Sequence, residues 1–236
     1  MATRGTTMGR FEQVVEACRE DYVRHIATNP LIQMLGEGRV SREHYAAYLV
    51  QTFHLVRHTS RTLALGAARC DDRKRALRAW FIEQAGEEHG HELFCLKDLR
   101  NLGVDAEAAV AAPAGPGASG LFTQNYFLAS YGNPVAILGV ASATEGMGAE
   151  IAGGFAQMLV QRYGIPEAAV TFLRSHAGFD QKHLVEARRA IEEFVTSDAD
   201  FDDVVHARRM TYHHYGQMFR DVAEGRVPLP TLARAA

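Results

Sequence analysis

Helical periodicity runs through almost the whole chain, and this feature constrains the fold more than any other. Apolar residues recur at intervals of three and four, and no run of alternating β-branched residues is bounded by turn signals. Helices are expected at about 9–28, 42–69, 71–102, 133–163, 165–197 and 199–224. A loop rich in Pro, Gly and Ala is expected at 111–120. The pattern predicts an all-α fold of about seven helices.

The chain has 236 residues without an evident linker or internal repeat, so we expect one domain, 1–236, with a tail at 225–236. Its 25 Lys and Arg against 28 Asp and Glu give a net charge of −3, which does not favour nucleic acid or an anionic membrane as a partner. A homodimer is expected.

Targeting signals are not expected in this sequence. Polar and glycine residues interrupt the most apolar stretch, 133–148, before it reaches the roughly 18 residues of a spanning helix. The N-terminus becomes acidic too early for a signal peptide. The three cysteines show no Cys-x-x-Cys spacing and are interpreted as reduced, buried thiols. We therefore expect a cytoplasmic protein with no membrane span.

Two imidazoles and a carboxylate lie close together within "SHAGFDQKHLVEARRAIEEF", residues 175–194. His176, Asp180 and His183 are spaced by four and three, so a helix places them within about 60° of one another. Imidazole and carboxylate groups are typical ligands of non-haem iron. If they serve a metal, this face turns into the protein, so Phe179, Leu184 and Ala187 should be buried and Gln181, Lys182 and Arg188 should lie nearer to water.

Two other segments offer matching ligands. Glu88 and His91 form a Glu-x-x-His pair, the spacing by which one helix supplies a carboxylate and an imidazole to dimetal sites in helical bundles. Glu145 lies within an otherwise apolar helix, where a lone carboxylate is costly without a cation or hydrogen-bond partner. Taken singly, each is also compatible with a charged surface or a buried polar pair. Together they predict a metal site.

The sequence also resembles the haem-oxygenase-like di-iron oxidases and oxygenases over most of its length. Residues 25–58 are similar to the opening helices of that fold, and "HELFCLKDLRNLGVD" (91–105) resembles the segment in which a ligand histidine precedes a leucine-rich helix. Residues 144–183 resemble the central stretch, with a ligand glutamate, then Tyr-Gly, then the His, Asp, His triplet. The resemblance implies a haem-oxygenase-like bundle. The implied ligands are His91, Glu145, His176, Asp180 and His183, together with one glutamate upstream of His91.

The glutamate upstream of His91 has alternatives, because its distance from the histidine varies within that family. Glu88 is three residues before His91, Glu87 four and Glu83 eight. Glu88 and Glu87 share a face with His91 on a straight helix, and Glu88 is preferred.

The resemblance implies an enzyme that binds two Fe(II) ions and uses dioxygen to oxidise a small organic substrate, with an external electron donor possible. N-oxygenation of an amino group in a biosynthetic pathway is the expected reaction. A desaturase, or an oxidase that cleaves a C–C bond or decarboxylates a fatty or amino acid, is the first alternative. A haem-binding or haem-degrading protein that uses His25 is the second.

Overall fold

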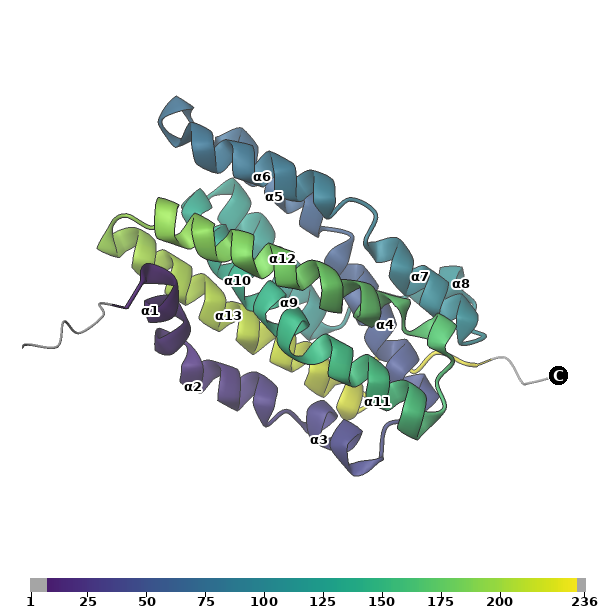
Figure 1. Ribbon diagram of the computed structural model, residues 1–236. Helices are drawn as coiled ribbons and strands as arrows, with labels where there is room; N and C mark the ends of the chain where they lie inside the picture. Colours follow the sequence, from purple (N-terminus) through teal and green to yellow (C-terminus); the bar gives the residue numbers. More distant parts are fainter. Residues whose placement is uncertain (1–7, 233–236) are drawn as a thin grey trace, which may run out of the picture.

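The structure, a computed structural model, describes residues 8–232, and all regular secondary structure within that range is helical (Figure 1). The α-helices are α1 (Arg10–Ala17), α2 (Arg19–Tyr22), α3 (Pro30–Glu37), α4 (Arg42–Val56), α5 (Thr59–Arg69), α6 (Arg75–Glu87), α7 (Glu92–Asn101), α8 (Ala106–Ala111), α9 (Pro116–Ser130), α10 (Ile137–Met147), α11 (Gly153–Tyr163), α12 (Thr171–Phe194) and α13 (Asp198–Ala223). Short 3₁₀ turns are η2 (Asp72–Lys74), η3 (Pro134–Ala136) and η5 (Glu167–Ala169), and π turns are η1 (Val23–Ala27) and η4 (Gly148–Ala152).

The expectation of about seven helices was too low, because the described chain contains about ten when nearly continuous segments are counted as one helix. Three pairs are continuous in this sense: α1 and α2 across Cys18, α4 and α5 across Arg57 and His58, and α10 and α11 through η4. The sequence reading had missed α3, whose first turn begins at Pro30 behind an Asn29 side chain that accepts a hydrogen bond from the Leu31 amide. After α13 the tail has no regular structure up to residue 232, and 1–7 and 233–236 lie outside the described residues.

The single helix expected over 71–102 is interrupted in its middle. Helix α6 ends at Glu87 and α7 begins at Glu92, and Gly90 between them has a φ of 88°. This left-handed conformation favours glycine and turns the chain away from the axis of α6. Glu88 and His91 therefore lie in a turn between two helices and not on one straight helix.

The loop expected at 111–120 is shorter and more tightly packed than its composition suggested. Helix α9 already begins at Pro116. A Cβ on Gly117 would lie 2.1 Å from the Met218 nitrogen, and the Gly117 amide donates to buried Asp221. The glycine here permits close contact between α9 and α13.

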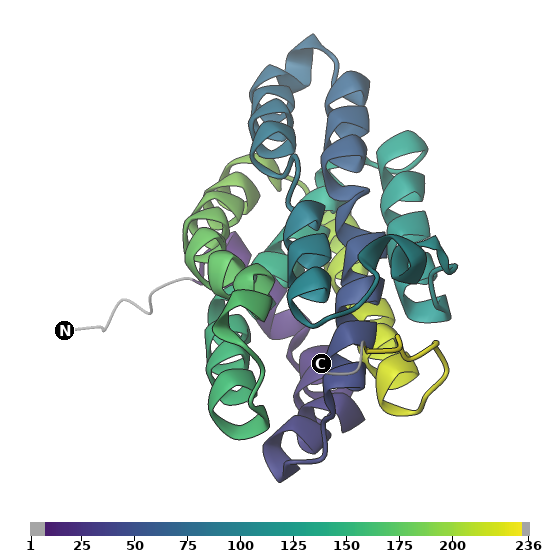
Figure 2. The ribbon, with the colours of Figure 1, turned by 90° about the vertical axis from the view of Figure 1, so that its right-hand side faces the viewer.

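The long helices α10, α12 and α13 form the centre of the bundle (Figure 1). Helix α13 packs against α9 and α10, and α12 packs against α10 and η4. Gly139 of α10 lies against the α13 backbone, where a Cβ would come within 2.2 Å of the Val204 carbonyl oxygen. Helices α5 and α6 form a pair that extends beyond the rest of the molecule (Figure 2). The central contact places α10 and α12 side by side, and both carry predicted ligands.

Helix α12 turns most of the predicted face inward. Ala187 is buried and Leu184 half-buried, while Gln181, Lys182 and Arg188 are exposed, as expected. The prediction for Phe179 was wrong, since this residue is 41% exposed. Its ring stacks on the imidazole of His91, with ring centroids 5.3 Å apart, and so covers His91 from the solvent side.

One helical stretch of the described chain, Pro134–Tyr163, is long and apolar enough to cross a membrane by length and composition. The expectation that no segment reaches this length was therefore wrong by that measure. Half of its most apolar 18-residue stretch is buried within the protein, and a helix in a protein core can be as long and as apolar as one that crosses a membrane.

Candidate metal centre

Three predicted residues from separate parts of the chain meet in one place, with Glu88 and Glu145 both beside the imidazole of His183. Its Nδ1 atom lies 3.5 Å from Oε1 of Glu88, which follows α6, and 3.4 Å from Oε2 of Glu145 on α10. These ligand atoms all lie within 4.8 Å of one another. Glu88 and His183 are buried and Glu145 is half-buried, so the group is shielded from bulk water.

Glu88 also connects this group to a second pair of histidines. Its other oxygen, Oε2, is 3.3 Å from Nδ1 of His91. The ring of His91 in turn lies 5.0 Å from the ring of His176, centroid to centroid. The two oxygens of one carboxylate thus face two different histidines.

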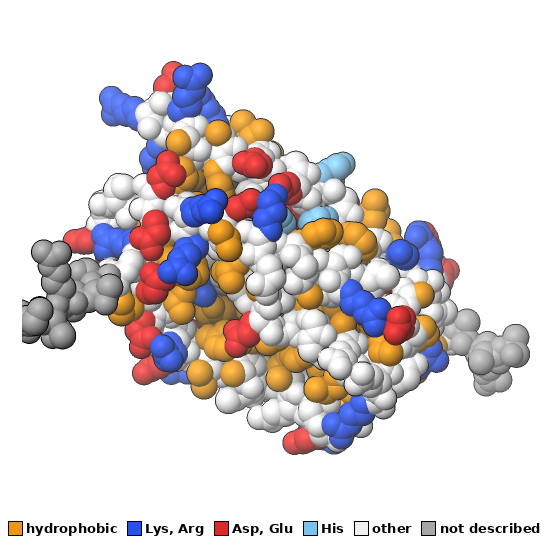
Figure 3. Space-filling view, viewed as in Figure 1, with side chains coloured by type: hydrophobic (Ala, Val, Ile, Leu, Met, Phe, Trp, Pro, Cys, Tyr) orange, Lys and Arg blue, Asp and Glu red, His pale blue; other side chains and the backbone are white. Residues whose placement is uncertain are grey.

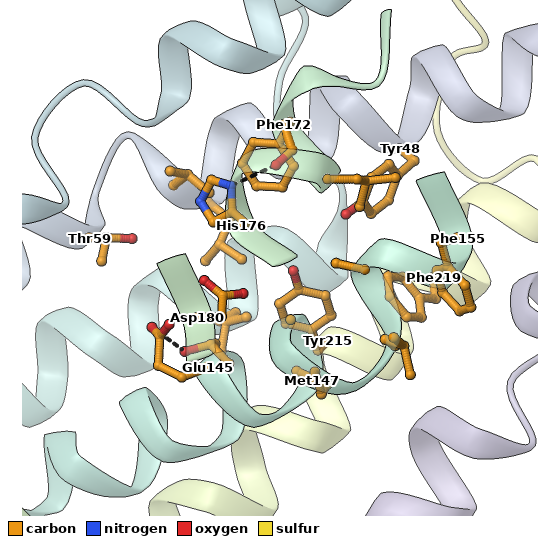
Figure 4. A pocket seen from close by; sticks show the side chains of 18 of the residues that line it. Tyr48, Thr59, Glu145, Met147, Phe155, Phe172, His176, Asp180, Tyr215 and Phe219 are labelled. Carbon is orange, nitrogen blue, oxygen red and sulfur yellow. Dashed lines mark hydrogen bonds between the residues drawn. The ribbon is translucent and has the colours of Figure 1, made fainter. Parts of the chain in front are cut away.

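Asp180 completes the predicted set on the side of Glu145. The two carboxyl groups share a hydrogen bond, and both lie on the wall of one cavity (Figure 4). Asp180 fits there because residue 148 is glycine: a Cβ on Gly148 would lie 1.4 Å from Oδ2 of Asp180. The glycine at the start of η4 therefore provides the space that the Asp180 carboxylate occupies.

The electrostatics show a cluster in which carboxylates outnumber cationic groups. Burial, followed by the neighbouring Glu145, raises the pKa of Asp180 to about 10, and burial also raises the pKa of Glu145. The adjacent Glu145 carboxylate is the main cause that raises the pKa of His183 to about 9. Without a cation the cluster therefore retains protons, which a divalent metal would displace.

The histidines are oriented as metal ligands require. Nδ1 of His176 donates to the Phe172 carbonyl at 2.8 Å, which leaves Nε2 with a free lone pair, and burial lowers the pKa of His176 to about 4, so the ring is neutral. Nε2 of His183 contacts Oε2 of Glu87 at 2.9 Å, which leaves Nδ1 for the cluster. Such hydrogen bonds fix the ring and tautomer of ligand histidines.

Two buried imidazole nitrogens support the presence of a metal. Nδ1 of His91 and Nδ1 of His183 have no hydrogen-bond partner in the structure, although both face carboxylates. A buried polar atom without a partner is costly. A metal ion between these nitrogens and the carboxylates would satisfy both. The imidazole and carboxylate donors fit iron.

The structure places the three candidate glutamates in three different environments. Glu88 lies in the cluster, Glu87 contacts the outer nitrogen of His183, and Glu83 is exposed. Glu87 also forms an ion pair with Lys182, so its charge is already compensated. The geometry therefore favours Glu88 as the metal ligand and Glu87 as the residue that orients His183.

A cavity of about 180 Å³ adjoins the cluster, and Glu88, Glu145, His176 and Asp180 line it. Most of its other lining residues are aliphatic or aromatic, from Leu31 in α3 to Trp80 in α6. The cavity is therefore a largely apolar space with a carboxylate and imidazole cluster in its wall.

Sequence reasoning had not identified Tyr48 and Tyr215, which line the same cavity with their hydroxyl groups directed into it (Figure 4). Burial raises the pKa of both Tyr48 and Tyr215 well above that of a free phenol, so both hydroxyl groups stay protonated. Both residues occur in long helices, α4 and α13, where the sequence pattern indicates a buried apolar face but not a cavity.

His25, the alternative haem ligand, does not line this cavity. It lies in η1, and its ring packs edge-to-face against His213 at a centroid distance of 5.1 Å. The adjoining Gly216 of α13 lies close to the His25 carbonyl, where a Cβ would come within 2.4 Å. His25 therefore belongs to a contact between η1 and α13.

Several solved structures share this fold. A domain of unknown function with a haem-oxygenase-like fold from Shewanella denitrificans is 23% identical, with a TM-score of 0.81 over 92% of this chain and 91% of that one. A TenA homologue from Pseudomonas syringae is 16% identical, with a TM-score of 0.74 over 92% and 93%. Haem oxygenase-2 from Synechocystis, in complex with haem and NO, is 11% identical, with a TM-score of 0.71 over 93% and 88%. At these identities the likeness establishes the fold alone.

The sequence comparisons place the chain more narrowly. None of the curated proteins matches it. A family model described as "iron-containing redox enzyme" matches residues 46–216, more than two-thirds of the chain, and this range contains all six predicted ligands. The expected all-α, haem-oxygenase-like fold is thus confirmed, and the chain belongs to this family of iron-containing redox enzymes.

Proposed function

We propose that the protein is a non-haem di-iron enzyme that uses dioxygen to oxidise a small organic molecule bound in the apolar cavity. The observation that carries this proposal is the position of Glu88, with one oxygen toward His91 and the other toward His183. Glu145, His176 and Asp180 adjoin the same carboxylate and bring the set to three imidazoles and three carboxylates. Six such ligands suit two Fe(II) ions and offset most of their charge.

Iron would supply the site with the capacity to bind and reduce dioxygen. The chain's own residues determine how the ligands are presented. Glu87 accepts the Nε2 proton of His183, and the Phe172 carbonyl accepts the Nδ1 proton of His176, so each ring directs its free nitrogen into the cluster. The surrounding aliphatic and aromatic side chains limit the access of water.

For the reaction, we propose N-oxygenation of an amine that is attached to an apolar body. An amine would approach the iron side of the cavity, formed by Glu88, Glu145 and Asp180, and the remaining lining accommodates hydrocarbon. The hydroxyl groups of Tyr48 and Tyr215 provide donors beside this wall.

The apolar lining of the cavity supports a second candidate, oxidation of an alkyl or acyl chain by desaturation or C–C cleavage. Apolar residues line the cavity on both sides of the cluster, with Leu35 and Leu159 on one side and Leu63 and Ile137 on the other. A chain that passes the cluster would present a C–H bond to it. The haem alternative has weaker support, because His25 faces His213 and not the cavity.

The proposal is tested by loading the protein with Fe(II) under argon and measuring bound iron. Two irons per chain are expected, and retention of less than about one would contradict the assignment. His91→Ala and His176→Ala should each abolish turnover and leave the helical content unchanged. Full activity in either variant would remove that residue from the ligand set.

The substrate class is tested by mixing the iron-loaded protein with dioxygen in the presence of amines, amino acids or fatty acids and following absorbance by stopped flow. Acceleration by amines with an apolar body supports N-oxygenation, whereas acceleration by fatty acids alone supports the second candidate. Addition of haem distinguishes the third, since an intense Soret band that is lost in His25→Ala would indicate a haem protein.

A further inference from the structure

A second hollow, of about 500 Å³, lies on the outside of the bundle between α1, α2, η4, α12 and α13. Phe11, Val15 and Leu184 contribute apolar walls, and Figure 3 shows hydrophobic side chains around a depression between α1 and α12. Met147 is in the wall of both this hollow and the central cavity. The proposed oxidation does not use this space.

A buried arginine lies at the base of the hollow. Arg208 of α13 is 5% exposed and is the only Lys or Arg in residues 8–232 that is classed as buried. Its Nη1 atom donates to the hydroxyl of Ser142 at 2.6 Å, and its guanidinium lies 5.3 Å from the centre of the Tyr212 ring. Its Nε atom has no hydrogen-bond partner.

Arg208 also lacks a negative partner. Within the described chain, no carboxylate lies within the 4.0 Å ion-pairing distance of its guanidinium, whereas the neighbouring Arg209 pairs with Asp21 at 3.2 Å. Burying a charge without a counter-charge is strongly unfavourable. Ser142 and the ring of Tyr212 are neutral, so they reduce this cost only in part.

We propose that the hollow is a binding site for a small organic monocarboxylate with an apolar body. The carboxylate would supply the missing negative charge and an acceptor for Nε of Arg208, and the body would contact Phe11, Val15 and Leu184. A single buried guanidinium balances one negative charge, which favours a carboxylate over a phosphate dianion.

Two phenols add donors at the same hollow. Tyr22 and Tyr212 both line it, with ring centroids 5.5 Å apart. Burial is the main cause that raises the pKa of each, Tyr22 to about 12, so both hydroxyls remain protonated. A protonated phenol can donate to a carboxylate oxygen. The hollow thus combines one buried cation, two phenol donors and an apolar wall, and the exposed Arg19 and Glu150 lie at the same hollow, where Glu150 accepts a hydrogen bond from Tyr22.

The test uses 4-bromobenzoate as the probe and neutral 4-bromobenzamide as its matched control, with the iron-loaded protein. Calorimetry under argon should detect binding of the acid and at least about tenfold weaker binding of the amide, as expected when a charge-assisted hydrogen bond is lost. The anomalous signal of bromine in crystals should place the acid beside Arg208. Equal binding of the amide, or bromine only in the central cavity, overturns the proposal.

Variants separate this site from non-specific attraction. Arg208→Met should weaken 4-bromobenzoate binding by about tenfold or more, while Arg209→Met, the adjoining surface arginine, should leave it within about twofold. If Arg208→Met does not fold, Val15→Trp fills the hollow from α1 and retains the guanidinium, and it should also prevent binding. Unchanged affinity in Arg208→Met or in Val15→Trp contradicts the assignment.

Discussion

Replacing Gly148 by alanine tests whether the Asp180 carboxylate must occupy its observed position to bind metal. A Cβ at residue 148 would lie 1.4 Å from Oδ2 and 2.6 Å from Cγ of Asp180. Ordinary contact begins at 3.4 Å, so the carboxylate must move by about 2 Å, the difference between 3.4 and 1.4 Å. In an open helical position the same substitution favours the helix by roughly 1 kcal/mol.

The substitution should affect iron binding strongly and the stability of the metal-free protein only slightly. Displacement of a ligand from its place should weaken Fe(II) binding by roughly 10- to 100-fold, the range for changes that disturb how metal ligands are held. The metal-free protein should lose little, because burial and Glu145 already disfavour the charged form of Asp180. Its melting temperature should stay within about 4 °C of the parent, which corresponds to about 1 kcal/mol for a chain of this size.

The measurement is an anaerobic Fe(II) titration together with thermal melts with and without metal. Gly154→Ala is the matched control, since Gly154 lies in the adjoining α11 with no atom within 4 Å of an added Cβ. It should bind iron as the parent does and melt at the same temperature or higher. If Gly148→Ala binds iron as tightly as Gly154→Ala, the reasoning that ties Asp180 to the metal through Gly148 is wrong.

Three further predictions concern the same cluster. Asp180→Asn should leave the metal-free protein as stable as the parent or more stable, yet reduce the rise in melting temperature that Fe(II) gives; a lower metal-free melt with an undiminished gain from iron would indicate a structural cluster instead. Glu88→Ala should cost iron binding far more than Glu83→Ala, as judged by bound iron per chain, and the reverse ranking would contradict the placement of Glu88. Because the pKa values of Asp180 and His183 are raised to about 10 and about 9, the folded protein binds more protons than the unfolded chain, so metal-free stability should fall as pH rises toward 9. Fe(II) binding should tighten over the same interval with release of protons, and a flat pH profile of the dissociation constant would exclude these groups as ligands.

Local features of the sequence could be predicted well. The spacing of His176, Asp180 and His183 depends only on helix geometry, and α12 places these residues on one side as expected. Exposure along the helix followed the same logic for Gln181 and Lys182. Phe179 departed from it because the ring of His91, from another segment, provides a stacking partner near the surface.

Positions between helices were not predictable from spacing. A straight-helix argument selected Glu88, but the structure holds Glu88 and His91 in a turn created by the positive φ of Gly90. Residues 116–120 of the expected loop belong to α9, where Gly117 allows the helix to approach the backbone of Met218. Both outcomes depend on what lies across the interface, which a periodic pattern does not encode.

By itself the sequence determined that the chain is helical and that imidazole and carboxylate side chains recur on its helices, because both follow from residue type and a repeat of 3.6. Only the tertiary structure decided that Glu88 faces His91 with one oxygen and His183 with the other, and that Gly148 makes room for Asp180. The apolar cavity and the unpartnered Nε of Arg208 were likewise visible only in the tertiary structure. Each depends on the packing of separate helices, which sets distances between residues far apart in the chain.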